Sequence, residues 1–163
     1  MSEIYVNITG YPNYQVSNFG NVKNVKTGRI LKPVPDRYGY LKVSLSNGGD
    51  ISTKSIHKLV ASEFLQNPEN KACVDHIDRN RTNNHTSNLR YATVSENSQN
   101  ASMKSNNTSG VTGVSFHKLS QKWRAEIRVN ESKKHLGYFV RIEDAIRARH
   151  DAEVLYFGEF RAV

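Results

Sequence analysis

An Asp-His pair and a later asparagine are the residues of this sequence best suited to chemistry. The pair is Asp75-His76, which follows a short apolar run, and the asparagine is Asn97. Hydrolysis of a phosphodiester needs a hard divalent cation with oxygen ligands and a base for the attacking water. Asp75 and Asn97 would supply the oxygens, and an imidazole with its ordinary pKa of about 6.5 is largely in its base form at pH 7. We therefore expect His76 to take the proton from water at a metal-dependent hydrolytic site.

Other polar residues near this set leave a plainer interpretation open. Polar loops often contain such residues without a function, and only the spacing of the whole set favours chemistry. Asn88 ends the polar loop, and we expect it to hydrogen-bond backbone groups across a hairpin and fix the histidine. Asp78 and Arg90 lie close enough to assist, but the sequence gives neither a definite role. For His85, a contact with a phosphate or with solvent is expected.

A strand, a loop, a second strand and a helix must position these residues. The apolar run enters the Asp-His pair as a short strand over residues 72–76, and residues 89–92 can return as a second strand. Thr93 or Ser95 can then cap a short helix that carries Asn97. The pattern predicts a ββα unit.

The residues before this unit indicate a small antiparallel sheet followed by a helix. Residues 1–50 alternate apolar and polar side chains between turn signals. Apolar residues then recur at helical spacing until Asn67-Pro68 stops the pattern, at Ile56, Leu59, Val60 and Phe64. His57, on this amphipathic helix, is expected to be a packed or capping histidine.

The last third of the chain indicates a separate sheet and helix. Residues 98–110 are rich in Ser and Asn and are expected to form a linker. In the segment KWRAEIRV, alternation gives one apolar face and one basic face, and two flanking segments complete a three-stranded meander. A helix follows and ends at Gly158, with a stripe of small residues at Ala145, Ala148 and Ala152.

Composition and charge narrow the class of protein. The 163 residues include 23 Lys and Arg against 15 Asp and Glu, a net charge of +8 that favours a polyanionic partner. No apolar run approaches the roughly 20 residues that span a bilayer, and the first residues do not resemble a secretory signal. Cys73 is the single cysteine, so neither a disulfide framework nor a multi-cysteine zinc site is expected. We expect a cytoplasmic protein without a membrane partner.

The segments VDHIDRNRTNNHTSNLR and YATVSEN resemble the HNH, or ββα-metal, nuclease motif. The version is that of phage and intron-encoded homing endonucleases, in which asparagine replaces the last histidine. The resemblance implies Asp75 and Asn97 as metal ligands, His76 as general base and Asn88 as the structural central asparagine. It also implies one divalent metal ion, Mg²⁺ or Mn²⁺. The flanking segments SIHKLVASEF, ITGYPNYQVSNFGNVKN, TGRILKP and GYLKVSL resemble the helix and the sheet module that accompany these nucleases.

The C-terminal segment SGVTGVSFHKLSQKWRAEIRVNESKKHLGYF, with its alanine-rich helix, resembles the DNA-binding domain of plant ethylene-response factors. This domain also occurs in phage homing nucleases, and in that family the polar sheet face enters the DNA major groove. The resemblance and the basic charge imply DNA contacts at Thr112, Ser115, His117, Arg124, Glu126, Arg128, Lys133, Lys134 and His135. Because Thr112, Ser115 and His117 replace common arginines and His135 replaces a tryptophan, the plant target sequence is not carried over.

Together these observations predict an α+β DNA endonuclease that acts on double-stranded DNA, as a monomer, in a phage-infected or bacterial host cell. Its expected parts are an N-terminal antiparallel β-sheet module that contacts DNA (1–52), the HNH hairpin with its preceding helix (53–100), a linker (101–109), and a C-terminal DNA-binding domain with a three-stranded antiparallel sheet and one helix (110–163). A catalytically inactive DNA-binding transcriptional regulator is the alternative. An RNA-binding protein is disfavoured because the aromatic-rich sheet motif of RNA readers is absent from the sequence.

Overall fold

Two small antiparallel sheets are formed by residues 2–55 in the computed structural model. In the first sheet, β1 (Tyr5–Ile8), β2 (Tyr11–Ser17) and β3 (Val22–Asn24) lie in the order β1-β2-β3. In the second, β4 (Val34–Pro35), β5 (Leu41–Asn47) and β6 (Asp50–Ser55) lie in the order β4-β5-β6. The β5–β6 turn consists of Gly48 and Gly49, both with positive φ, as a two-residue hairpin turn of this kind requires. The alternation in the sequence therefore predicted strands, and the structure divides them between two sheets.

The HNH segment begins with the helix α1 (Ile56–Phe64) and continues as a two-stranded hairpin. In the hairpin, β7 (Cys73–His76) pairs antiparallel with β8 (Leu89–Ala92), and the short 3₁₀ turn η1 (Thr86–Asn88) leads into β8. These elements agree closely with the helix and strands that the apolar spacing predicted.

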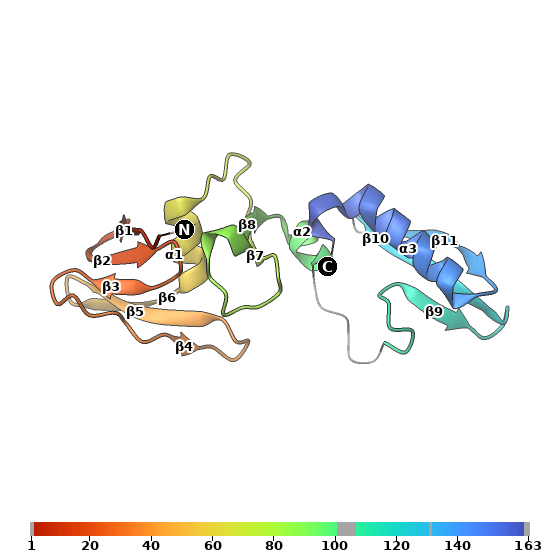
Figure 1. Ribbon diagram of the computed structural model, residues 1–163, viewed down its shortest axis with the longest axis horizontal. Coiled ribbons are helices and arrows are strands. Elements are labelled where there is room, and N and C mark those ends of the chain that lie inside the picture. Colours follow the sequence, from red (N-terminus) through yellow and green to blue (C-terminus); the bar gives the residue numbers. More distant parts are fainter. Residues whose placement is uncertain (1, 101–106, 131, 162–163) are drawn as a thin grey trace. The chain divides into compact units, whose positions relative to one another are not determined.

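The sheets, α1 and the hairpin share one hydrophobic core instead of forming separate modules. Figure 1 shows α1 among the strands of this part, and it contacts β1, β2, β5, β6, β7 and β8. The buried residues of the core come from both sheets, the helix and the hairpin: Ile8, Tyr14, Val16, Val22, Val43, Leu45, Ile56, Leu59, Val60 and Leu89. The expected division at residues 52–53 therefore does not separate two cores, because a small two- or three-stranded sheet cannot bury its apolar face alone.

The chain divides into two units, Met1–Thr93 and Val94–Val163. The structure describes residues 2–100, 107–130 and 132–161, so most of the expected linker, residues 101–106, lies outside the described residues. The helix α2 (Val94–Gln99), which carries Asn97, belongs to the second unit. No helix in the described ranges is long and apolar enough to cross a membrane.

The second unit contains a three-stranded antiparallel sheet covered by a helix. The strands β9 (Val114–His117), β10 (Lys122–Val129) and β11 (Ser132–Phe139) lie in the order β11-β10-β9. The helix α3 (Ile142–Phe157) runs along β10 and β11 in Figure 1 and ends at Gly158, where the turn η2 (Gly158–Phe160) begins. Ala145 and Ala152 of α3 are buried against the apolar sheet face, as the small-residue stripe predicted.

Candidate active site

Asp75 and His76 are the last two residues of β7, and both side chains are almost fully buried. In the hairpin register Asp75 lies opposite Arg90 of β8. Arg90 Nε and Nη2 lie 3.0 and 2.9 Å from the same oxygen, Asp75 Oδ2. Because an unpaired buried carboxylate would be costly, the guanidinium offsets its charge and fixes its orientation. Arg90 was given no definite role from the sequence, although its position opposite Asp75 follows once the strand pairing is known.

A third asparagine, Asn84, which the sequence interpretation did not single out, contacts the ring of His76. Asn84 Oδ1 lies 3.1 Å from His76 Nε2, and both side chains are buried. The amide Nδ2 of Asn84 donates to the carbonyl oxygen of Thr82 at 3.3 Å, so Oδ1 is the atom that faces the imidazole. Oδ1 only accepts hydrogen bonds, which requires that Nε2 of His76 carries a proton. In the neutral ring the lone pair is then on Nδ1.

Asn88 connects the two ends of the polar loop. Its Oδ1 accepts from the backbone N–H of Asp78 at 3.0 Å, and its Nδ2 donates to Asp78 Oδ1 at 2.9 Å and to the carbonyl oxygen of Asn83 at 2.8 Å. Burial alone would raise the pKa of Asp78, but hydrogen bonds from Asn83, Asn80 and Asn88 lower it overall. Asn88 thus makes backbone bonds across the hairpin, and its contribution to catalysis stays a prediction.

Two aromatic rings pack around His76. The ring centroid of His57 lies 5.2 Å from that of His76, and Tyr40 lies 5.0 Å from His57 and 5.9 Å from His76. His57 Nδ1 is buried without a hydrogen-bond partner among the described residues. Burial, followed by the nearby charges of His76 and Lys58, lowers the pKa of His57 to about 4. His57 is therefore a neutral, packed histidine at pH 7.

The oxygen donors of the site fit a hard divalent cation better than zinc. Among the described residues, no group of three or more His, Cys, Asp or Glu side chains could hold a metal. The Asp75 carboxylate is a hard oxygen donor that suits Mg²⁺, which keeps several waters in protein sites. Arg90 already binds Asp75 Oδ2, so a cation here must share that carboxylate with the guanidinium. Asn97 is half-buried on α2 in the second unit, and its pairing with Asp75 on one metal stays a prediction.

The polar face of the second sheet gathers most of the residues that were expected to contact DNA. Opposite residues of an antiparallel pair share a face, and Arg124 lies opposite Ser115 and Tyr138. In the same way Glu126 lies opposite His135, and Arg128 lies opposite Lys133. His117 joins this face through a ring contact of 5.1 Å with Tyr138, an exposed aromatic residue that the sequence interpretation missed. Thr112 is exposed just before β9.

Lys134 departs from the expected arrangement. It lies opposite Ile127, which is buried under α3, and its Nζ lies 4.7 Å from the ring centre of Tyr156 on that helix. Consecutive strand residues alternate between faces, so Lys133, Lys134 and His135 cannot all point the same way. The structure therefore places Lys134 on the helix side of the sheet, and its expected contact with DNA stays a prediction.

Glu126 is the acidic residue at the centre of the polar face. Its carboxylate lies 3.0 Å from Lys133 Nζ and 3.5 Å from Arg124 Nε. Burial acts to raise the pKa of Glu126, but the bond from Lys133 and the charge of Arg124 lower it overall. The face thus combines positive charge with one ionised acceptor.

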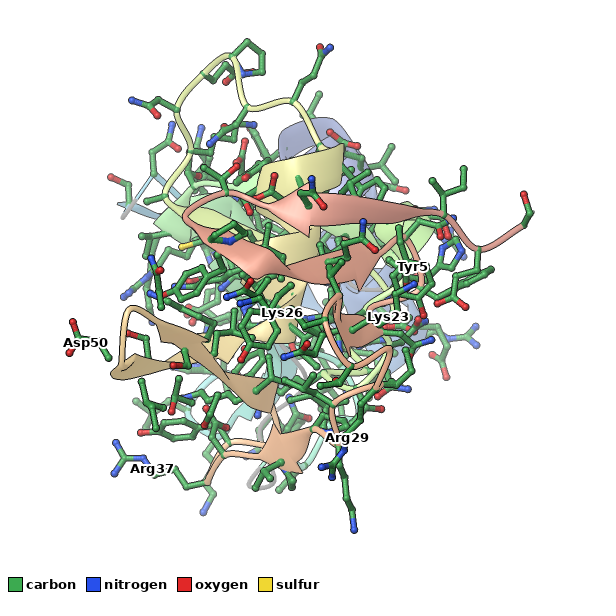
Figure 2. All side chains as sticks on the ribbon, turned by 90° about the vertical axis from the view of Figure 1, so that its left-hand side faces the viewer. Tyr5, Lys23, Lys26, Arg29, Arg37 and Asp50 are labelled. Atoms are coloured by element: carbon green, nitrogen blue, oxygen red, sulfur yellow. The ribbon has the colours of Figure 1, made fainter. Side chains whose placement is uncertain are left out.

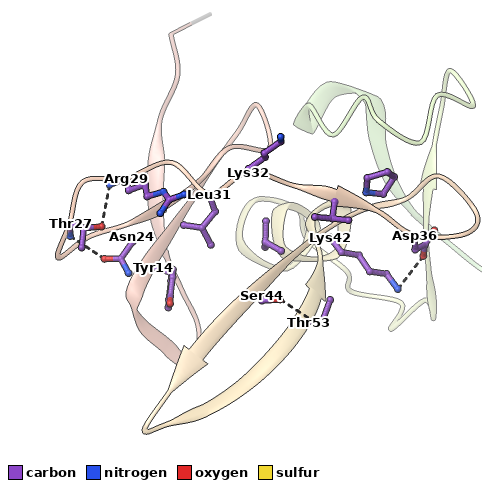
Figure 3. Close-up of a pocket in the computed structure, with 13 residues that line it drawn as sticks. Tyr14, Asn24, Thr27, Arg29, Leu31, Lys32, Asp36, Lys42, Ser44 and Thr53 are labelled. Atoms are coloured by element: carbon purple, nitrogen blue, oxygen red, sulfur yellow. Dashed lines mark hydrogen bonds and ion pairs between the residues drawn. The ribbon is translucent and has the colours of Figure 1, made fainter.

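The first unit has an open, basic groove of about 750 Å³ that the sequence did not reveal. Figure 3 shows it between β2 and β5, with Arg29, Lys32 and Lys42 along its length. Lys42 Nζ pairs with Asp36 at 3.1 Å, whereas Arg29 and Arg37 extend outward from this unit in Figure 2. The groove is thus lined by cationic groups and by the hydroxyls of Thr27, Ser44 and Thr53.

Comparison with known proteins gives two family matches in the first hundred residues. Residues 3–46 match the NUMOD4 motif, and residues 56–99 match the HNH endonuclease family. Residues 56–99 are therefore similar to the HNH endonuclease family, in agreement with the resemblance noted for the segments around Asp75, His76 and Asn97. HNH endonucleases generally use a divalent metal ion.

Individual relatives agree with this assignment. DNA endonuclease I-HmuI of Bacillus phage SP01 is 42% identical over 94 residues, which cover 57% of this chain and 54% of the relative. Uncharacterized HNH endonuclease L247 of Acanthamoeba polyphaga mimivirus is 46% identical over 105 residues, covering 61% of this chain and 26% of the relative. The chain thus spans about half or less of the length of these relatives.

A solved structure, described as DNA binding and cleavage by the HNH homing endonuclease I-HmuI, is also similar. It has a TM-score of 0.53 and 41% sequence identity, and the match covers 55% of this chain and 52% of that chain. The small antiparallel sheets and few helices are therefore shared with a homing endonuclease. The resemblance of the C-terminal unit to ethylene-response factors stays a prediction.

Proposed function

We propose that this protein is a site-specific, divalent-metal-dependent DNA endonuclease. The observation that carries the proposal is the buried Asp75-His76 pair at the end of β7, in which each side chain is held by a partner from the same hairpin. The HNH family match and the DNA endonuclease relatives support the same reaction. The proposal includes action in the cytoplasm of a phage-infected or bacterial host cell.

In phosphodiester hydrolysis, His76 would act as the base and Asp75 as the charged ligand of the metal ion. His76 takes the proton from the attacking water as the water oxygen bonds to phosphorus and the bond from phosphorus to the leaving sugar oxygen breaks. Asp75 and Asn97 would hold a divalent cation, which stabilises negative charge on the phosphate and leaving oxygens when bound. Asn88 keeps the loop closed around the base, and Arg90 orients Asp75.

Two basic surfaces would bind the DNA. In the second unit, Arg124 and Arg128 have the geometry to bind guanine edges, and Glu126 can accept from cytosine. In the first unit, Arg29, Lys32 and Lys42 along the groove would contact phosphates of the DNA backbone. One catalytic site per chain would cut one strand in each binding event if the protein acts as a monomer.

The test is cleavage of a plasmid library in Mg²⁺, with both strands sequenced at the ends produced. We expect cuts at a preferred sequence that disappear in EDTA. His76→Ala should lower the cleavage rate by roughly 10² to 10⁴-fold and leave DNA affinity nearly unchanged. A protein that binds DNA but never cuts it under these conditions would instead support the inactive regulator.

A further inference from the structure

A tight turn at the end of β2 lies against the polar loop that surrounds His76. Within the turn, Ser17 Oγ accepts from the backbone N–H of Asn21 at 3.0 Å, and Ser17 is fully buried. The backbone N–H of Thr86 donates to the carbonyl oxygen of Asn18 at 2.9 Å, so the turn is bonded to the loop. The rings of Phe19 and His85 add a contact at 4.7 Å between centroids.

Gly20 of this turn touches Asn84 so closely that no other residue fits. Its φ is +87°, and a Cβ atom at Gly20 would lie 2.7 Å from Asn84 Cβ and 3.3 Å from both Asn84 O and Ile56 Cγ2. None of these three contact atoms is the flexible end of a long side chain. The missing side chain of Gly20 therefore sets where the buried Asn84 side chain can be.

Asn84 in turn determines which ring nitrogen of His76 carries the proton. With its Nδ2 on the carbonyl of Thr82, its Oδ1 accepts the proton of His76 Nε2 at 3.1 Å. This bond selects the neutral form of the ring whose lone pair is on Nδ1, and it fixes the direction of that lone pair. An orienting partner of this kind is what an imidazole base needs to accept a proton from one water position.

We propose that Asn84 is a positioning residue for His76, and that the turn of residues 17–21 holds Asn84 in place through Gly20. The inference rests on the proposed nuclease function, because Asn84 is assigned as the partner of His76, the base of the proposed reaction. It also implies that the N-terminal sheet, besides any contact with DNA, is required for the alignment of the base. The link lies entirely within the first unit.

The first test replaces Asn84 and measures single-turnover cleavage in Mg²⁺ as a function of pH, together with DNA affinity in EDTA. Asn84→Leu, which removes the acceptor at similar volume, should lower the rate about 10- to 100-fold with DNA affinity unchanged. Asn84→Asp keeps the acceptor and adds a negative charge, which stabilises the imidazolium. Its rate should therefore stay above that of Asn84→Leu.

The second test compares alanine substitutions at two glycines that both have a positive φ. Gly10 has a φ of +78° and open space where a Cβ would lie, so Gly10→Ala introduces the strain of a positive φ without a clash. Gly20→Ala introduces both. Gly10→Ala should cleave within about twofold of wild type, whereas Gly20→Ala should approach the loss of Asn84→Leu, about tenfold or more.

The third measurement does not depend on cleavage. The ¹⁵N chemical shifts of the His76 ring, measured by NMR above pH 8, distinguish a proton on Nε2 from one on Nδ1. We expect the Nε2–H form in wild type and Gly10→Ala, and a mixture of both forms in Asn84→Leu and Gly20→Ala. Unchanged ring shifts and cleavage rates in the Asn84 variants would overturn the inference even though wild type cleaves. A wild type that does not cleave, with the expected ring shifts, would overturn the proposed function alone.

Discussion

Arg90 donates two hydrogen bonds to one oxygen of Asp75, from Nε at 3.0 Å and from Nη2 at 2.9 Å. Both side chains are largely buried, with 13% and 7% of their surfaces exposed. The proposed metal ligand thus already forms an ion pair with a protein group. A cation that binds Asp75 does so in competition with, or beside, this guanidinium.

Arg90→Met should make the fold depend on a divalent cation. Loss of the guanidinium leaves a buried carboxylate without its cationic partner, which costs on the order of 3 to 5 kcal/mol of unfolding free energy. A cation bound to Asp75 would recover part of this cost, so Mg²⁺ should raise the melting temperature more in Arg90→Met than in wild type. Arg90→Lys, which keeps a positive charge, should respond as wild type does. Equal shifts in all three proteins would mean that Arg90 and the cation do not share Asp75.

The two proposed metal ligands should differ in their effect on metal affinity. Asp75 carries the charge that attracts the cation, whereas Asn97 offers a neutral oxygen. Asp75→Asn should therefore raise the Mg²⁺ concentration for half-maximal cleavage more than Asn97→Ala does, with partial recovery at high metal. Cleavage rates measured over a range of Mg²⁺ concentrations give this half-maximal concentration for each variant. Cleavage by wild type in EDTA at the rate seen in Mg²⁺ would refute the metal assignment.

His57 should make the first unit less stable in mild acid. Its folded-state pKa is about 4, below the ordinary value of 6.5, because burial and the charges of His76, Lys58 and Lys42 outweigh the opposite effect of Asp36. The unfolded chain then binds a proton below pH 6.5 that the folded chain does not bind until about pH 4. Stability is therefore lost as the pH falls through this window, by up to about 3 kcal/mol from this residue.

His57→Phe supplies the control for this pH dependence, because phenylalanine keeps a ring beside Tyr40 and His76 but does not titrate. Urea unfolding of both proteins at several pH values between 7.5 and 4 gives the difference. The wild-type free energy of unfolding should decline more steeply toward acid than that of His57→Phe. Parallel curves would show that His57 titrates alike in the folded and unfolded chain.

Lys133 and Lys134 should affect DNA binding differently although they are neighbours of equal charge. Lys133 lies on the polar face beside Glu126, whereas Lys134 lies over Tyr156 on the helix side. If Lys133 neutralises one phosphate, Lys133→Ala should reduce the slope of log Kd against log salt by about 0.9. Lys134→Ala removes the same charge and should leave the slope nearly unchanged. Equal slopes for the two variants would show that the polar face does not bind the backbone.

Local pattern was enough to predict most elements of the fold and to single out candidate residues for the site. The spacing of apolar residues from Ile56 predicted α1, and the alternation from Trp123 to Val129 predicted β10 and its two faces. Asp75 and His76 were found from their chemistry and from the short strand before them. Helical and strand periods, and the side-chain groups that can bind a metal or a proton, are properties of neighbouring residues, so a single sequence contains them.

The partners of those residues were decided by the tertiary structure. The register of β7 and β8 places Arg90 opposite Asp75. The register of β10 and β11 places Lys134 opposite Ile127, on the helix side of the sheet. Asn84 contacts His76 within one loop, whereas Gly20, which packs against Asn84, comes from a segment far away in the chain. Such contacts depend on how the sheets and α1 pack around one core, and packing between distant segments leaves no periodic signal in a single sequence.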